Sequence, residues 1–239
     1  MKLKFGYILL ILIIGGGFII AGIINVNYYS DDPDSAHNRS KNNVLDVINP
    51  NDVNDALVDS SMQHIRKGHT IKDFSFLNQM GKEVTLADLD GKIYVANFFF
   101  TTCGGICPKM SKQLQRVQTE FSDDDNFMIL SHTVNPKYDS VPVMFNYAER
   151  FEADHDKWWF LTGSKEELYI SARQSYMVVP SPDDPHFQHG DESDFIHTEN
   201  FVLIDPDKRI RGMYDGTNKS EVSEMMRDIY DLKKEYKLN

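Results

Sequence analysis

The chain has only two cysteines among its 239 residues, and neither lies near residue 20. A lipoprotein anchor, which needs a cysteine at that place, is therefore excluded. Basic residues are also scarce, since 25 Lys and Arg face 36 Asp and Glu, which gives a formal net charge of −11. Phosphate binding needs a basic surface, so nucleic acid is excluded as a partner. No internal repeat is present.

The one long hydrophobic run covers residues 5–24, which carry no charge. Twenty apolar residues suffice to cross a bilayer as a helix. Lys2 and Lys4 precede the run, and three aspartates follow it within ten residues. We therefore expect a single-pass anchor in a bacterial cytoplasmic membrane, with the N-terminus inside and the globular part on the periplasmic or extracytoplasmic side. A cleaved signal peptide is the alternative, but no small-x-small cleavage site closes the run.

The rest of the chain divides in two by composition. Residues 25–63 are rich in Asn, Asp and Ser and have little apolar periodicity, which predicts a flexible linker between the anchor at 1–24 and the domain. Residues 64–239 contain regular apolar segments and have the length of one domain with its own core.

Within 64–239 the pattern alternates strands and helices. Buried strands are predicted at 92–100 and 127–133, a short strand at 158–161, and a hairpin at 201–204 and 210–214 around an Asp-Pro-Asp-Lys turn. Helices are predicted at 108–121, 141–151, 165–175 and 219–236. This is an α/β pattern with a mixed sheet flanked by helices. Because the cysteines lie between the first buried strand and its helix, the thioredoxin-like fold matches best.

Cys103 and Cys107 are the most informative residues of the chain. Residues four apart lie on one face of a helical turn, so both sulfurs can point at one atom. Two converging thiolates can form a disulfide or hold a soft metal ion. The spacing is one residue longer than the C-x2-C of thioredoxin-type redox sites, which weakens an oxidoreductase interpretation. A position at a helix N-terminus favours the thiolate form, which helps both metal binding and disulfide exchange, so it does not discriminate between these two functions.

A third ligand would discriminate, and an imidazole added to two thiolates suits copper and also zinc. Among the eight histidines, His197 directly precedes the strand 201–204, and in a thioredoxin-like sheet that loop approaches the cysteine turn. His186 and His189 are expected to be loop residues able to bind metal only adventitiously. His132, inside a strand, and Met110, on the apolar stripe of a helix, are expected to belong to the core.

Four stretches in order carry a resemblance to a known family. They are residues 99–103 through 107–108, 131–136, 147–151 running on to 159–163, and 197–198 running on to 201–207. With these, the chain resembles the Sco (SenC/PrrC) family of membrane-anchored copper proteins. It departs from the usual family pattern in having Gly104-Gly105 in place of Pro-Asp, Ile196 in place of an acidic residue, and Asn135 in place of Asp.

The resemblance implies a thioredoxin-like fold that binds one copper ion, Cu(I) or Cu(II), through Cys103, Cys107 and His197. It also implies a role in assembling the Cu(A) centre of cytochrome c oxidase. We therefore expect a copper metallochaperone, not an enzyme. Its expected partners are oxidase subunit II, an upstream copper donor or thiol reductant, and the membrane that holds the anchor.

Three other functions are open. In a thiol–disulfide oxidoreductase that keeps the Cu(A)-site cysteines reduced, Cys103 would attack the partner's disulfide and Cys107 would resolve the mixed disulfide. A peroxiredoxin-like peroxidase would need a proline where the chain has Asn97. A purely structural disulfide would close so short a loop that it would stabilise the fold little.

Overall fold

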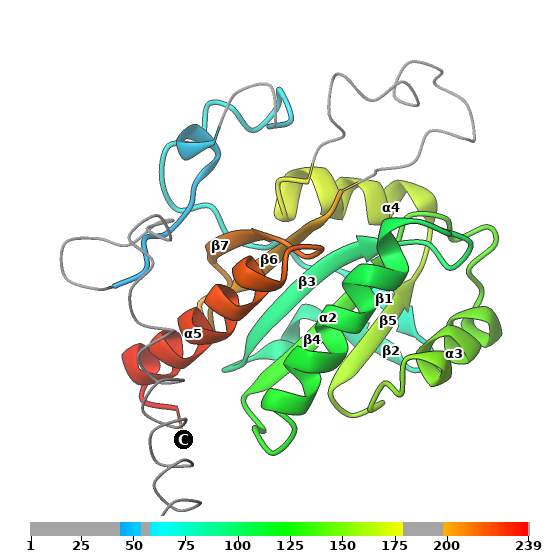
Figure 1. The fold of residues 1–239 in the computed structure, drawn as a ribbon. Coiled ribbons are helices and arrows are strands. Elements are labelled where there is room, and N and C mark those ends of the chain that lie inside the picture. The colour runs from blue at the N-terminus through cyan, green and yellow to red at the C-terminus, as the bar shows by residue number, and fades with distance from the viewer. Residues whose placement is uncertain (1–43, 54–57, 179–197, 239) are drawn as a thin grey trace, which may run out of the picture. The chain divides into compact units, whose positions relative to one another are not determined.

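A computed structural model of the chain describes residues 44–53, 58–178 and 198–238. In this part a mixed sheet has the strand order β2-β1-β5-β4-β3-β6-β7 (Figure 1). The strands are β1 (Ser75–Asn78), β2 (Glu83–Thr85), β3 (Ile93–Phe99), β4 (Phe127–Thr133), β5 (Trp158–Thr162), β6 (Asn200–Ile204) and β7 (Ile210–Asp215).

The three central strands β3, β4 and β5 are parallel, and the outer strands are antiparallel to their neighbours. Residues of β3 and β4 pair in step, from Ile93 with Phe127 to Phe99 with Thr133. Both strands therefore end at the same edge of the sheet, where the cysteine turn follows β3. The thioredoxin-like mixed sheet predicted from the sequence is confirmed.

Helices cover both faces of this sheet. The helices α2 (Ile106–Glu120), α3 (Val141–Arg150) and α5 (Lys219–Tyr236) pack on one face. The opposite face is covered by η3 (Leu86–Leu89), α4 (Lys165–Ile170) and the π-helical turn η4 (Ser171–Ser175). All seven residues of β3 are buried, and its six apolar side chains enter the two hydrophobic clusters on opposite faces of the sheet.

The predicted elements are confirmed with shifted ends, but the strands β1 and β2 and the short 3-10 helices η1 (Pro50–Asp52) and η3 were missed. The helix α2 begins at Ile106, so Cys107 lies in its first turn instead of before it. The helix predicted over 165–175 changes from α to π geometry at Ser171. The hairpin of β1 and β2 was missed because its strands have four and three residues, too few for alternation to stand out.

Part of the predicted linker packs on the domain. Leu45, Ile48 and Met62 are buried, and the backbone N–H of Ile48 donates to the carbonyl of Ile210 at 2.9 Å. Low order was expected for this stretch because its few apolar residues follow no period. The predicted anchor at 5–24 lies outside the described residues. Within the ranges that the structure describes, no helix is long and apolar enough to span a membrane.

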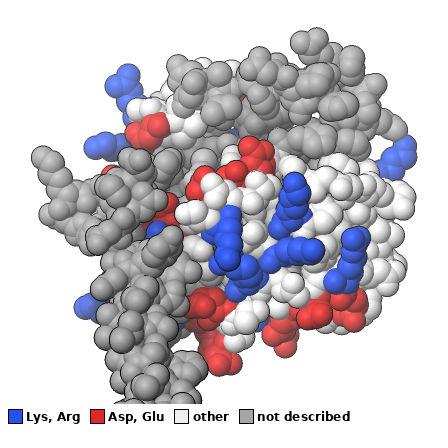
Figure 2. Space-filling view, viewed as in Figure 1, with Lys and Arg blue, Asp and Glu red and all other residues white. Residues whose placement is uncertain are grey.

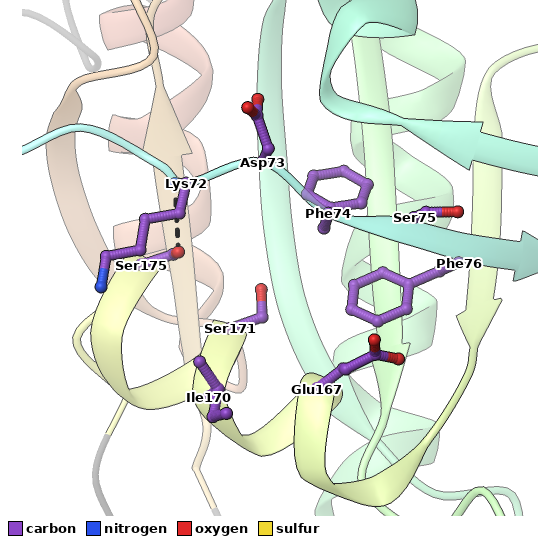
Figure 3. A pocket seen from close by; sticks show the side chains of 9 residues that line it. All are labelled: Lys72, Asp73, Phe74, Ser75, Phe76, Glu167, Ile170, Ser171 and Ser175. Atoms are coloured by element: carbon purple, nitrogen blue, oxygen red, sulfur yellow. Dashed lines mark hydrogen bonds between the residues drawn. The ribbon is translucent and has the colours of Figure 1, made fainter.

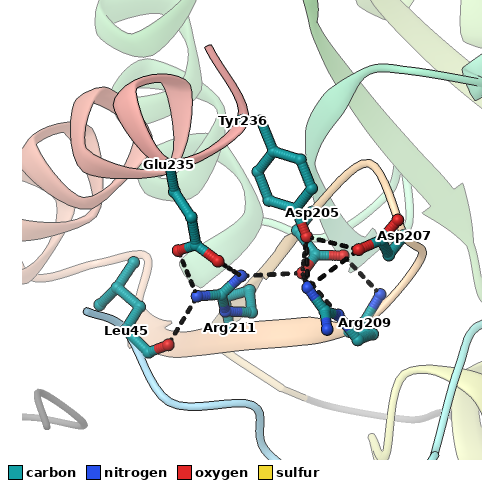
Figure 4. Close-up of polar contacts among 7 residues, drawn as sticks. All are labelled: Leu45, Asp205, Asp207, Arg209, Arg211, Glu235 and Tyr236. Atoms are coloured by element: carbon teal, nitrogen blue, oxygen red, sulfur yellow. Dashed lines mark hydrogen bonds and ion pairs between the residues drawn. The ribbon is translucent and has the colours of Figure 1, made fainter. Parts of the chain in front are cut away.

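A buried charge network ties this N-terminal segment to the hairpin β6–β7 (Figure 4). Asp205, in the turn of the hairpin, is fully buried and accepts hydrogen bonds at 2.9 Å from Arg209, Arg211 and Tyr236. Arg211, itself 1% exposed, also donates to Glu235 of α5 and to the carbonyl of Leu45. The aspartate of the predicted Asp-Pro-Asp turn therefore organises the fold at this end of the molecule.

Candidate functional site

The two cysteines lie where β3 gives way to α2. After Phe99 the chain turns sharply, and the backbone N–H of Cys103 donates to the carbonyl of Phe100 at 3.2 Å. Gly105 is the N-cap residue of α2, and Cys107 falls in the first helical turn. Both cysteines are free thiols; Cys103 is half-buried and Cys107 is buried in the core.

The two thiols interact but are not equivalent. Burial alone would raise the pKa of Cys103, but hydrogen bonds from three backbone N–H groups of the helix start and from the Cys107 thiol lower its pKa below the ordinary value. Burial raises the pKa of Cys107 to about 12, and its contact with the Cys103 sulfur adds to this rise. The pair therefore consists of an accessible, acidic thiol and a buried thiol that donates a hydrogen bond to it.

Gly104 and Gly105 leave free space beside the two thiols. A Cβ atom added to either glycine would meet no heavy atom of its surroundings within 4 Å. The space around both positions would therefore admit a side chain, as the residues of the family pattern have. Gly105 makes no side-chain cap, so the N–H groups of residues 105–107 are left to serve the Cys103 sulfur.

A buried carboxylate holds the turn that carries Cys103. Asp139 is fully buried and accepts hydrogen bonds from the backbone N–H and the hydroxyl of Thr101 and from the hydroxyl of Thr133. It thereby joins the end of β4 to the turn two residues before Cys103. Asp139 was not predicted from the sequence, where its only signal is its position after the strand that neighbours β3.

The predicted third ligand, His197, lies outside the described residues. Within them, no group of three His, Cys, Asp or Glu side chains could hold a metal ion, so the two thiols have no described third partner. The pairing of Ala96 with Val202 and Tyr94 with Ile204 places the start of β6 at the same edge of the sheet as the end of β3.

Two other side chains considered from the sequence, Met110 and His132, have core positions, whereas His186 and His189 lie outside the described residues. Met110 is fully buried under α2, as predicted. His132 is also fully buried, with its ring stacked on Phe98 at 5.1 Å between centroids. Among the described residues neither ring nitrogen finds a hydrogen-bond partner, and burial lowers the pKa of His132 to about 3. It is a neutral core histidine at physiological pH.

A separate cavity of about 420 Å³ lies between the chain entering β1 and the helical segment α4–η4 (Figure 3). Phe74, Phe76 and Ile170 line it, together with polar side chains at its rim. The hydroxyl of Ser171 is buried there, and no residue in the described part of the chain forms a hydrogen bond with it. Neither cysteine lines this cavity, so it is not part of the thiol site.

The fold and the site together define a class. A mixed sheet of thioredoxin type carries two free, unequal thiols at the N-terminus of the helix after its central strand, which makes this a thioredoxin-like dithiol protein. The family model described as SCO1/SenC matches residues 62–234, and the chain belongs to this family. The resemblance seen in the sequence is thereby confirmed.

Similar proteins support the assignment. The chain is 29% identical over 164 residues to the SCO1 protein homolog of Bacillus subtilis, covering 67% of this chain and 81% of that protein. It is also 29% identical to the mitochondrial SCO2 homolog of Mus musculus, of which it spans only 57%. The solved structure of BsSco, described as a member of the Sco family of cytochrome c oxidase assembly proteins, matches with a TM-score of 0.58 at 26% identity, over 69% of this chain and 93% of that one.

Proposed function

We propose that this protein binds a copper ion and delivers it to the Cu(A) centre of cytochrome c oxidase. The observation that carries the proposal is the thiol pair: two free, mutually hydrogen-bonded cysteines at a helix N-terminus, in a chain of the SCO1/SenC family. Thiolates are the ligands that a soft ion such as Cu(I) prefers. A structure of Arabidopsis thaliana ScoI, described as having copper bound, shares the fold with a TM-score of 0.53.

In this proposal Cys103 and Cys107 supply thiolates and neutral His197 completes the ligand set. Binding must displace the proton of Cys107, whose pKa burial raises to about 12, so copper affinity increases with pH. The accessible side of the site is that of Cys103, which leaves an approach for ligands of the acceptor. Copper is cargo here, and transfer proceeds by ligand exchange with oxidase subunit II. The anchor predicted at residues 5–24 would keep donor and acceptor at the same membrane surface.

The inequality of the thiols favours a second function, reduction of the disulfide between the Cu(A)-site cysteines. The Cys103 thiolate would attack one sulfur of that disulfide and release the other as a thiolate. Cys107 would then lose its proton and attack the mixed disulfide. The products are a Cys103–Cys107 disulfide and two reduced cysteines on the partner, so two electrons move and no further reactant is needed. The more acidic, more accessible thiol is the one suited to the first attack.

The test is a Cu(I) titration of the reduced full-length chain in neutral detergent against a competing chelator. We expect one copper per chain, no binding in Cys107→Ser, and affinity at least about tenfold lower in His197→Ala, about 1.4 kcal/mol. His64→Ala, which changes an exposed histidine, is the matched control. Unchanged affinity in His197→Ala would refute the three-ligand site. A wild type that binds no copper but reduces the Cu(A) disulfide would favour the reductase.

A further inference from the structure

A basic patch lies on the face formed by α2 and α5, although the chain as a whole is acidic. Figure 2 shows Lys and Arg side chains gathered over these two helices. We define the basic patch as Lys109, Lys112 and Arg116 of α2 with Lys219 and Arg227 of α5. Lys109, Lys112 and Lys219 are exposed, and the two arginines are half-buried.

Contacts between the two helices bring these residues together. Arg116 donates to the hydroxyl of Ser223 at 3.2 Å, and Tyr230 donates to Glu120 at 2.7 Å. The helices therefore run side by side in the same direction. Lys219 and Arg227 lie one turn before and one turn after Ser223, so they flank the point where Arg116 meets α5.

The position of these cations is unfavourable for the helix that carries them. Cations destabilise the N-terminal turns of a helix, yet α2 has Lys109 and Lys112 in its first two turns and no acidic residue in the first. Lys109 and Lys112 are three apart, and Lys112 and Arg116 four apart, which places like charges side by side. Neither lysine forms an ion pair with a carboxylate of the described residues. The stability of α2 does not explain these charges.

The basic patch adjoins the end of α2 that holds the thiols. Lys109 is two residues beyond Cys107, in the same helical turn. Any protein that exchanges copper or electrons with Cys103 must approach this end of the helix and meets the lysines beside it. Fixed positive charge there attracts an acidic surface and repels a basic one.

We infer that the basic patch is the docking surface for a carboxylate-rich protein surface around the metal site of the partner. This deepens the proposed function, on which it rests, by stating the charge of the surface that the copper-accepting protein must present. A protein partner is favoured over an anionic lipid surface, because the net charge of −11 makes the chain as a whole repelled by such a membrane. A protein partner can contact the basic patch alone.

The experiment measures binding of the apo Cu(A) domain of the host's oxidase subunit II to the reduced full-length chain in neutral detergent. The charge-reversed variant is Lys109→Glu with Lys112→Glu, and the rescue variant is Lys109→Arg with Lys112→Arg. Lys67→Glu with Lys82→Glu changes the net charge equally at exposed sites away from α2 and is the matched control. Melting temperatures are recorded for all variants.

We expect the charge-reversed variant to bind the Cu(A) domain at least about tenfold more weakly at low salt, mainly through slower association. Binding of the wild type should weaken as salt rises from about 20 to 200 mM, and that of the charge-reversed variant much less. The control and the arginine variant should bind as the wild type does. The melting temperature of the charge-reversed variant should stay equal or rise, because Glu suits a helix N-terminus.

Equal binding of wild type and charge-reversed variant, or no binding by either, would overturn the inference. It would also be overturned if charge reversal abolished binding to phosphatidylglycerol vesicles and left Cu(A)-domain binding unchanged, because the patch would then serve a lipid surface. Copper affinity is measured on the same samples. A chain that binds no copper defeats the proposed function, whereas unchanged copper affinity with unchanged docking defeats the patch alone.

Discussion

Two fully buried aspartates hold two different regions of the molecule together: Asp139 lies near the cysteine turn, and Asp205 lies in the β6–β7 turn. Asp205 in the β6–β7 turn is surrounded by cations, since Arg209 and Arg211 both donate to it at 2.9 Å. Asp139 near the cysteine turn is satisfied by hydroxyl groups and a backbone N–H, with no cation among these partners.

The difference follows from what each aspartate holds in place. Asp205 joins long-range elements, because Arg211 continues the network to Glu235 of α5 and to the carbonyl of Leu45. Asp139 holds only the short turn two residues before Cys103, and the hydrogen bonds that it accepts bring no cation to that turn. The ion pairs of Asp205 therefore hold distant elements of the fold together, whereas the neutral donors to Asp139 fix the shape of the cysteine turn.

The largest effect is expected from Asp205→Ala. The substitution leaves the buried Arg211 with Glu235 as its remaining carboxylate partner, which should lower the free energy of unfolding by up to about 3–5 kcal/mol. Urea denaturation measures this loss. Asp207→Ala, which removes an exposed partner of Arg209, should cost at most about 1 kcal/mol. Equal losses in the two variants would contradict the central role of Asp205.

Should Asp205→Ala not fold, Tyr236→Phe, which removes one donor to Asp205, should cost about 1 kcal/mol.

An intermediate effect on stability is expected from the protonation of His132, which is fully buried and has no side-chain hydrogen bond to any described residue. Its folded pKa of about 3 lies below the unfolded value of 6.5, so the unfolded chain takes up the proton first as pH falls. Its contribution to stability is complete above about pH 6.5 and is lost toward pH 3, at up to about 1.4 kcal/mol per pH unit. Urea denaturation between pH 7 and pH 4 should give a flatter pH dependence for His132→Phe than for wild type. His64→Phe, at an exposed site, should leave the slope unchanged, and a slope unaffected by His132→Phe would refute this account.

Asp139→Asn is expected to lower stability less than Asp205→Ala does, but it should also change the pKa of Cys103. The amide replaces one acceptor oxygen by a donor, so the hydroxyl of Thr101 or Thr133 must either turn to accept a hydrogen bond or lose it, at a cost of up to about 1–3 kcal/mol. The loosened turn should hold the Cys103 sulfur less firmly against the N–H groups of α2 and raise its pKa. The pH midpoint of iodoacetamide alkylation at Cys103, followed by mass spectrometry, should therefore increase. Asp207→Asn should leave the midpoint in place, and an unchanged midpoint in Asp139→Asn would separate Asp139 from the site.

Much of the fold was predictable because its central elements are locally encoded. A continuous apolar run predicts β3 as a strand buried on both faces, and the stripe including Met110 and Leu114 predicts α2. The cysteine pair was visible for the same reason, since its two members lie within one helical turn. The role of His197 stays a prediction.

What sequence alone determined was the α/β pattern, the family and the thiol pair, because each depends on residues close together in the chain. Only the tertiary structure decided that Cys103 is acidic and Cys107 is not, that Asp139 shapes their turn, and that Leu45 and Ile48 pack on the domain. It also brought the cations of α2 and α5 onto one face. Burial and contact partners are set by elements distant in sequence, and no local period records them.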